Sequence, residues 1–128
     1  MDKLLFVALG GAVGSVARYL TGVSAGRLVG PHYPWAGTFA VNVVGGFLMG
    51  FLVSWLAHRG GADQERWRVL LGVGALGGFT TFSAFSLEVA LMIERRAWGE
   101  AASYVAASVV LSVAALFAGL WAARRLLA

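Results

Sequence analysis

The sequence predicts an all-α integral membrane protein with four transmembrane helices in a single domain, residues 1–128. Hydrophobic residues make up 59% of the chain and charged residues 12%, about half of the charged share that is usual in soluble domains. The apolar residues form four runs, each long enough to supply the roughly 20 residues that cross a bilayer core. Nearly all basic residues lie at or between the ends of these runs, where they would meet lipid headgroups.

The first two spans are expected at about Leu4–Leu28 and Trp35–Leu56. The first run ends before Pro31 and Pro34, which favour turns or extended backbone. It belongs to a series of similar runs, so we expect it to be retained as a span and not removed as a signal peptide. The second run contains no charged residue and ends at a polar turn, residues 58–61.

The third span is expected from about Asp63, whose side chain is a candidate N-cap, to about Glu94. Its middle contains a cluster of small and polar residues: Gly72, Gly74, Gly77, Gly78, Thr80 and Thr81. Non-helical backbone inside a membrane persists only where it is buried in protein or faces a polar cavity. We therefore expect this helix to be broken near its middle, at a buried site where free carbonyls could hold a hard cation.

The fourth span, about Glu100–Ala123, is free of charge between its ends. Tyr104, Ser108 and Ser112 recur at intervals of four, which places three hydroxyls on one helix face. A single such hydroxyl could bond to its own helix. Three in register favour a polar stripe along the span.

The charge pattern excludes nucleic acid as a partner and leaves the orientation weakly specified. The net charge is +4, but no basic stripe runs along an exposed helix. With four spans, both termini and the turn between the second and third spans share one side. That side carries six basic residues against three on the other, with acidic residues on the richer side, which is a weak bias.

The run after the glycines places Phe82 and Phe85 on one helix face, with Ser83 and Ser86 on an adjoining face. Core packing would by itself explain the two aromatic rings. Their combination with hydroxyls at every turn favours a polar pathway, in which the positive ring edges can meet an anion.

Four further polar residues lie inside spans. Asn42, with Thr38 one turn earlier, offers amide and hydroxyl donors in the second span; an ordinary hydrogen bond between helices is the alternative. Glu88 lies three residues after Phe85, near the mouth of the same face, and charges within spans usually mark function. Arg18 is either a structural anchor or a contributor to a positive potential, and its position leaves both open.

No pattern suited to catalysis is present. The chain lacks cysteine, and no His or Asp stands at a spacing suited to a metal site or a catalytic dyad, so we do not expect an enzyme. Residues 72–77 match the GxGxxG dinucleotide fingerprint, but that motif needs a preceding strand and a soluble βαβ unit.

Three motifs together resemble the Fluc (CrcB) family of fluoride channels. They are GGAVG at 10–14 followed by Arg18 and Tyr19, Gly37 and Thr38 with Asn42 and Gly45, and GGFTTFSAFS at 77–86. The resemblance covers nearly the whole chain. It implies an antiparallel, dual-topology homodimer in the plasma membrane that passively exports cytoplasmic fluoride.

The resemblance also implies a role for individual residues. It assigns Phe82 and Phe85 to phenyl rings that line two fluoride pathways and Asn42 to an amide donor beside them. It places on the polar track Thr38, Ser83, Glu88, Tyr104, Ser108 and Ser112. Backbone carbonyls of Gly77 and Thr80 would hold a structural Na⁺ at the dimer centre. Ala84 departs from the family, which commonly has threonine there.

A proton-coupled exporter of small cationic drugs is the main alternative, because such exporters can also be four-helix, dual-topology dimers. It would need a carboxylate near mid-membrane, whereas the first span has none there and Glu88 lies toward an end. A scaffold protein would account for the glycine repeats but would leave the aligned donors without a use.

Overall fold

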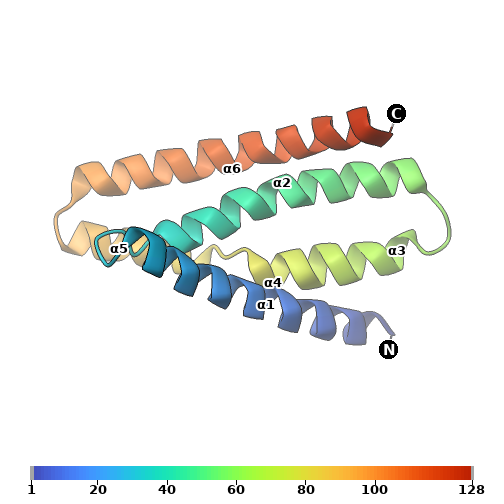
Figure 1. Ribbon diagram of the computed structural model, residues 1–128, viewed down its shortest axis with the longest axis horizontal. Helices are drawn as coiled ribbons and strands as arrows, with labels where there is room; N and C mark the ends of the chain where they lie inside the picture. The colour runs from blue at the N-terminus through green and yellow to red at the C-terminus, as the bar shows by residue number, and fades with distance from the viewer. Residues whose placement is uncertain (1, 128) are drawn as a thin grey trace.

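The computed structural model describes residues 2–127, which form helices joined by short turns (Figure 1). Four stretches are long and apolar enough to cross a membrane, as the sequence predicts. They are Asp2–Val29, Ala36–Arg59, Gln64–Glu94 and Trp98–Leu127. Three of them are the single helices α1, α2 and α6, and the third contains α3 (Gln64–Trp67), η1 (Arg68–Leu76), α4 (Gly77–Phe79) and α5 (Ser83–Glu94).

The helices extend beyond the apolar runs that predict them. Helix α6 begins at Trp98, not Glu100, and continues to Leu127, past Ala123. Helical hydrogen bonding continues into the headgroup region, where charged side chains are tolerated, so an apolar run underestimates the length of a transmembrane helix. The same holds for α1 (Asp2–Val29) and for α2, which continues to Arg59.

The four spans pack as two close pairs. Helix α6 lies along α2, and α1 lies along η1 and α4; α2 also contacts α1 and η1, so it joins the two pairs (Figure 1). Both termini lie at the same end of the molecule, together with the turn between α2 and α3 (Figure 1). This arrangement matches the side assignment that an even number of spans requires.

Glycine allows each close pair to approach backbone to backbone. A Cβ at Gly14 on α1 would meet the carbonyl oxygen of Ala75, and one at Gly119 on α6 would meet that of Phe47. Such contacts matter in lipid, because packing is the main attraction between transmembrane helices. The glycines therefore fix which helix faces meet.

The first half of the third span is wider than an α-helix. Nine residues, Arg68–Leu76, form the π-helix η1, which the sequence analysis does not predict. π-Helical turns are rare and are frequently found at functional sites. Here the wide turn directly precedes α4 and the non-helical residues that follow it.

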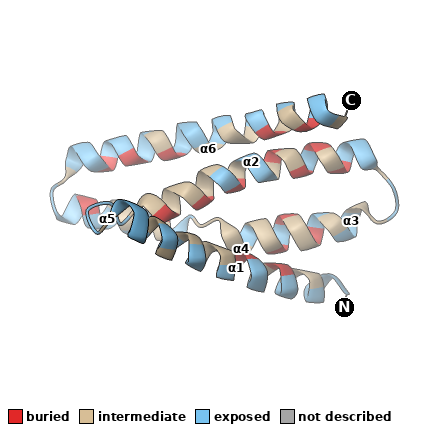
Figure 2. Ribbon diagram, in the orientation of Figure 1, coloured by how far each residue is buried: buried red, intermediate tan, exposed pale blue. Residues whose placement is uncertain are grey.

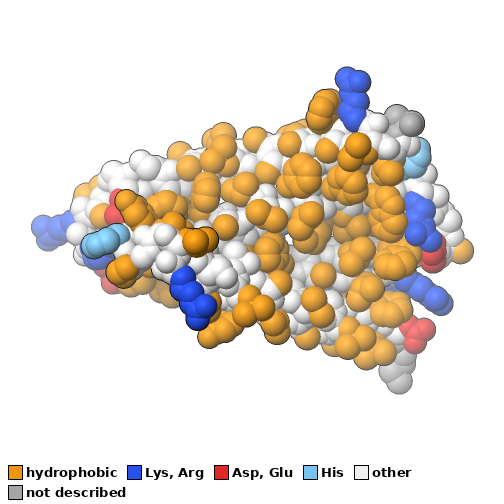
Figure 3. Space-filling model, in the orientation of Figure 1, with side chains coloured by type: hydrophobic (Ala, Val, Ile, Leu, Met, Phe, Trp, Pro, Cys, Tyr) orange, Lys and Arg blue, Asp and Glu red, His pale blue; other side chains and the backbone are white. Residues whose placement is uncertain are grey.

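The outer surface is largely apolar. Val41 and Met92 are fully buried, whereas Leu4 and Leu28 are 74% and 86% exposed. Figure 2 shows exposed residues along the outer faces of the helices, and Figure 3 shows hydrophobic side chains between charged residues at the two ends. This surface is suited to lipid.

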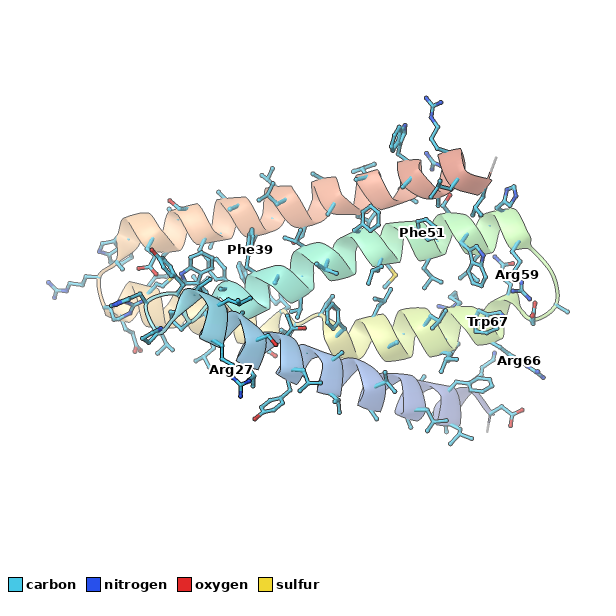
Figure 4. The ribbon with its side chains drawn as sticks, in the orientation of Figure 1. Arg27, Phe39, Phe51, Arg59, Arg66 and Trp67 are labelled. Atoms are coloured by element: carbon cyan, nitrogen blue, oxygen red, sulfur yellow. The ribbon has the colours of Figure 1, made fainter. Side chains whose placement is uncertain are left out.

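An aromatic and charged cluster fixes the turn between α2 and α3. The Arg59 guanidinium lies 5.4 Å from the ring centroid of Trp55 and 5.7 Å from that of Trp67, near the right-hand end of Figure 4. Asp63 occupies the predicted N-cap position but does not cap with its side chain. Its carboxylate instead accepts from Arg59 Nη2 at 2.8 Å and Trp67 Nε1 at 3.2 Å.

Candidate functional site

The helical conformation is interrupted between α4 and α5. Thr80 is extended, with φ −84° and ψ 159°, and helical structure resumes at Ser83. The Thr80 N–H donates to the Leu76 carbonyl at 3.0 Å, so the last helical bond of the first half is made there. The groups that follow must find other partners.

Asn42 on α2 supplies partners for the residue after Thr80. Its Nδ2 donates to the Thr81 carbonyl at 2.9 Å, and its Oδ1 accepts from the Thr81 N–H at 2.8 Å. The acceptor half of this pair fixes the amide orientation, since a backbone N–H can only donate. Asn42 thus binds the interrupted backbone through both of its polar atoms, and its second N–H remains for another acceptor.

The interruption frees two particular carbonyls from their helical donors. In a continuous helix the Thr81 N–H would donate to Gly77 and the Ala84 N–H to Thr80. The Thr81 N–H instead bonds to Asn42, and the Ala84 N–H donates to the Thr81 hydroxyl at 3.2 Å. Gly77 and Thr80 are the two residues whose carbonyls the resemblance assigns to a cation, and hard cations bind oxygen ligands.

A carbonyl between these two is bonded from another helix. Arg18 Nε on α1 donates to the Gly78 oxygen at 3.1 Å. Arg18 also lines a cleft of 360 Å³ together with Tyr19, Thr38 and Thr81. The structure therefore places the arginine against the interruption, in agreement with a structural anchor.

The two predicted phenyl rings are adjacent but differ in exposure. Their centroids are 5.6 Å apart with an interplanar angle of 44°. Phe85 is 9% exposed and packs against Tyr104, whereas Phe82 is 78% exposed. The Phe82 ring therefore projects from the packed helices.

A cleft of 410 Å³ passes between α2, the interruption and α6. It brings together both rings, Phe82 and Phe85, and three of the predicted donors, Asn42, Ser108 and Ser112, with Thr80 and Thr81 from the interruption. None of the described residues that line it is charged. The cleft is therefore neutral, apolar over most of its wall, and polar only at a few points.

Two hydroxyls in this cleft are buried without a partner. Within residues 2–127, the Ser108 and Ser112 Oγ atoms form no hydrogen bond. A hydroxyl removed from water without a partner costs about 1–3 kcal/mol, so a ligand that accepts hydrogen bonds would be stabilised there. These two hydroxyls of the α6 stripe are thus available to donate to a ligand.

Three other predicted residues form a separate cluster. Glu88 on α5 accepts from the Thr38 hydroxyl and from the Tyr104 hydroxyl, each at 2.7 Å. The carboxylate ties α2, α5 and α6 together outside the residues that line the large cleft. Ser83 is also outside that lining: it is exposed, and its hydroxyl lies 3.3 Å from that of Thr81.

Sequence reasoning missed Thr81 as a site residue. Its backbone pairs with Asn42 and its hydroxyl accepts the Ala84 N–H, so it links the interruption to the start of α5. The signal was present in the sequence, because a threonine three residues before a helical amide is a common cap. The sequence pattern used this threonine only as one of the small and polar residues that predict the break, and assigned no partner to its backbone or hydroxyl.

Comparison with known proteins gives consistent matches along the chain. The family model described as CrcB-like protein, Camphor Resistance (CrcB), matches residues 5–120. A protein of Caulobacter vibrioides strain NA1000 is 70% identical over 128 residues, the whole of both chains. One from Phenylobacterium zucineum is 69% identical over the same length, and one from Agrobacterium fabrum is 54% identical over 126 residues, covering 98% of this chain and 99% of its own. All three are named "Fluoride-specific ion channel FluC".

Proposed function

This chain belongs to the CrcB family, and from that premise we propose that it is a fluoride-selective channel of the plasma membrane that lets cytoplasmic fluoride leave passively. The observation that carries the proposal is the neutral cleft with two buried, unpartnered hydroxyls beside a phenylalanine pair. The family relationship suggests the ion, and the cleft supplies groups suited to it.

Fluoride is small and holds water tightly, so a pathway must replace its hydration shell with closely spaced donors. The Ser108 and Ser112 hydroxyls and the second N–H of Asn42 are such donors. Ring edges of Phe82 and Phe85 carry the positive part of the aromatic quadrupole. Because the described lining contains no charged side chain, the ion meets no fixed charge that would trap it.

No energy coupling is needed for export. With the cytoplasm negative, the membrane potential favours exit of an anion by about 2.3 kcal/mol per 100 mV. A proton-coupled exporter would need a carboxylate in the pathway. The carboxylate of Glu88 lies outside the cleft lining and already accepts two hydrogen bonds, so the channel is favoured.

The pathway is completed by a second, antiparallel copy of the chain. Phe82 is 78% exposed although it lies in the middle of a span, and the cleft it lines is open on one side of the subunit. An antiparallel partner would cover this face and bring a second ring pair to it. The weak charge bias of the sequence is compatible with insertion in both orientations.

A structural Na⁺ fits the interruption. The carbonyls of Gly77 and Thr80 have lost their helical donors, and oxygen ligands are those that hard cations take. Across residues 2–127, no group of three or more His, Asp or Glu side chains could serve as an alternative cation site. A bound cation would make the potential more favourable for anions near the dimer axis.

The proposal is tested in liposomes loaded with fluoride and chloride, with an electrode for each ion. We expect fluoride release without a proton gradient, little chloride release, and loss of fluoride release in Phe82→Ile and Phe85→Ile. Phe117→Ile is the matched control, because Phe117 is 65% exposed on α6 and does not line the cleft. Vesicles that stay tight to fluoride, or that release both halides equally, would contradict the channel.

A further inference from the structure

Three carbonyls within residues 77–80 lose the hydrogen-bond donors that a continuous helix would give them. Those of Gly77 and Thr80 lose their helical donors, as described above. The Gly78 carbonyl between them would accept from the Phe82 N–H in a continuous helix, but Phe82 lies beyond the extended Thr80 and before the start of α5. Arg18 Nε takes the place of that donor at 3.1 Å.

Close packing of α1 on α4 brings the arginine to this carbonyl. A Cβ at Gly78 would lie 2.7 Å from the Gly11 carbonyl oxygen and 3.2 Å from the Ser15 amide nitrogen. The two backbones are thus in contact about one turn before Arg18. The hydrogen bond joins residues 60 positions apart, so it couples α1 directly to the end of α4.

We infer that Arg18 is a positioning residue: its Nε–H replaces the helical donor of Gly78 and so holds the carbonyls of Gly77 and Thr80 in place for the cation. This inference rests on the sodium site of the proposed function. Asn42 acts on the other side of Thr80, where it binds Thr81. The two side chains, from α1 and α2, hold the interruption on both sides of the freed carbonyls.

A role through hydrogen bonding differs from a role through charge. A positive potential at long range depends on the guanidinium charge and not on which nitrogen faces the protein. The contact that the structure contains is specific, since it joins Nε to one carbonyl oxygen that has lost its backbone donor. Removal of such a donor from a partly buried carbonyl inside an apolar span leaves that carbonyl unsatisfied.

Substitutions at residue 18 separate donor from charge. Glutamine carries its amide nitrogen the same number of bonds from Cα as Nε of arginine, so Arg18→Gln keeps the donor and removes the charge. Arg18→Met has similar length without donor or charge. Arg18→Lys keeps the charge but has a carbon at the Nε position. Arg27→Gln is the control, because Arg27 is exposed near the end of α1 and points away from the helices (Figure 4).

The main measurement is the thermal unfolding midpoint of the purified protein as NaCl replaces N-methyl-D-glucamine chloride. We expect Na⁺ to stabilise the unaltered protein, Arg18→Gln and Arg27→Gln at similar concentrations. In Arg18→Met the half-saturating Na⁺ concentration should rise about tenfold, the loss expected for one hydrogen bond. The half-saturating Na⁺ concentration of Arg18→Lys should lie between those of the unaltered protein and Arg18→Met. Fluoride release should fall in the same order.

If Arg18→Lys matches the unaltered protein while Arg18→Gln behaves like Arg18→Met, charge is what matters and the inference is overturned. It is also overturned if Arg18→Met binds Na⁺ normally or if the unaltered protein ignores Na⁺. Should Arg18→Met fail to fold, the comparison of glutamine with lysine still decides. If liposomes that contain the unaltered protein do not release fluoride, the proposed channel is refuted. The order of the residue 18 variants in half-saturating Na⁺ concentration is measured independently of that result.

Discussion

Asn42 shows what one uncharged side chain can do for backbone inside a membrane. An N–H or carbonyl left unpaired there costs several kcal/mol, and Asn42 satisfies one of each on Thr81. The sequence left two roles for this residue, a donor to an anion and a hydrogen bond between helices. The structure contains the hydrogen bond between helices, and Asn42 also lines the cleft.

Aspartate at residue 42 would break half of this pair. Asn42→Asp keeps an acceptor for the Thr81 N–H but sets a second oxygen against the Thr81 carbonyl. We expect a loss of about 1–3 kcal/mol, the usual cost of an unsatisfied buried polar group, and reduced fluoride release. Thermal unfolding and the liposome assay measure the two effects.

Ser86→Ala is the control for this substitution. The Ser86 hydroxyl donates to the Phe82 carbonyl at 3.0 Å, but the Ser86 N–H donates to the same oxygen at 2.8 Å. The carbonyl therefore stays paired, and a change within about 0.5 kcal/mol is expected. Equal stability of Asn42→Asp and Ser86→Ala would show that Asn42 does not hold the interruption.

At the scale of elements, the seam between α1 and the third span positions the site. Gly14 lets α1 lie against Ala75 and Phe79, and the same helix then delivers Arg18 to Gly78. The π-helix η1 lies along this seam. The packing of α1 on the third span thus also sets the hydrogen bond at the interruption.

A methyl group in the seam should separate these elements. In Gly14→Ala the new Cβ would meet the Ala75 carbonyl oxygen and lie 2.9 Å from the Phe79 nitrogen. Backbone atoms cannot rotate away, so we expect a loss of about 1–3 kcal/mol, as for other overpacked positions. The unfolding midpoint measures it.

Gly26→Ala on the same helix provides the comparison. A Cβ there has no atom within 4 Å, and alanine favours a helix over glycine by up to about 1 kcal/mol. We expect unchanged or slightly higher stability. If both alanines are tolerated equally, the close approach at Gly14 is not required.

At the scale of the whole molecule, an apolar outer surface with charges at both ends allows two orientations in the membrane. Six basic residues lie at one end and three at the other, and both ends also carry acidic residues. An antiparallel pair would place equal charge on both sides of the bilayer. Formation of such a pair would cover the open cleft and the exposed Phe82 ring.

Cysteine labelling tests the two orientations, because the chain contains no cysteine of its own. Ala62→Cys and His32→Cys place single thiols in exposed turns at opposite ends. With dual topology, an impermeant maleimide added to intact cells should label about half of each variant, since the charge bias is weak. Full labelling of one variant and none of the other would establish a single orientation.

Many residues of the candidate site could be predicted because they form patterns within a single span. The glycines and threonines of 72–81, the ring pair and the α6 hydroxyl stripe are patterns within a single span. Asp63 shows the limit of such reasoning: its position as N-cap was predicted, but its partners Arg59 and Trp67 depend on how the turn folds. The position of Glu88 likewise did not indicate its bonds to Thr38 and Tyr104.

Patterns along the chain suffice to predict four apolar spans, the small residues where helices can approach, and the polar residues that need partners away from water. The partners themselves follow from the packing of the spans: Asn42 pairs with Thr81, 39 positions apart, and Arg18 with Gly78, 60 positions apart. The π-helical conformation of η1 was likewise not visible in the sequence pattern. The physical reason is that a one-dimensional pattern records which groups need a hydrogen bond, whereas the distance between spans sets which atoms can supply it.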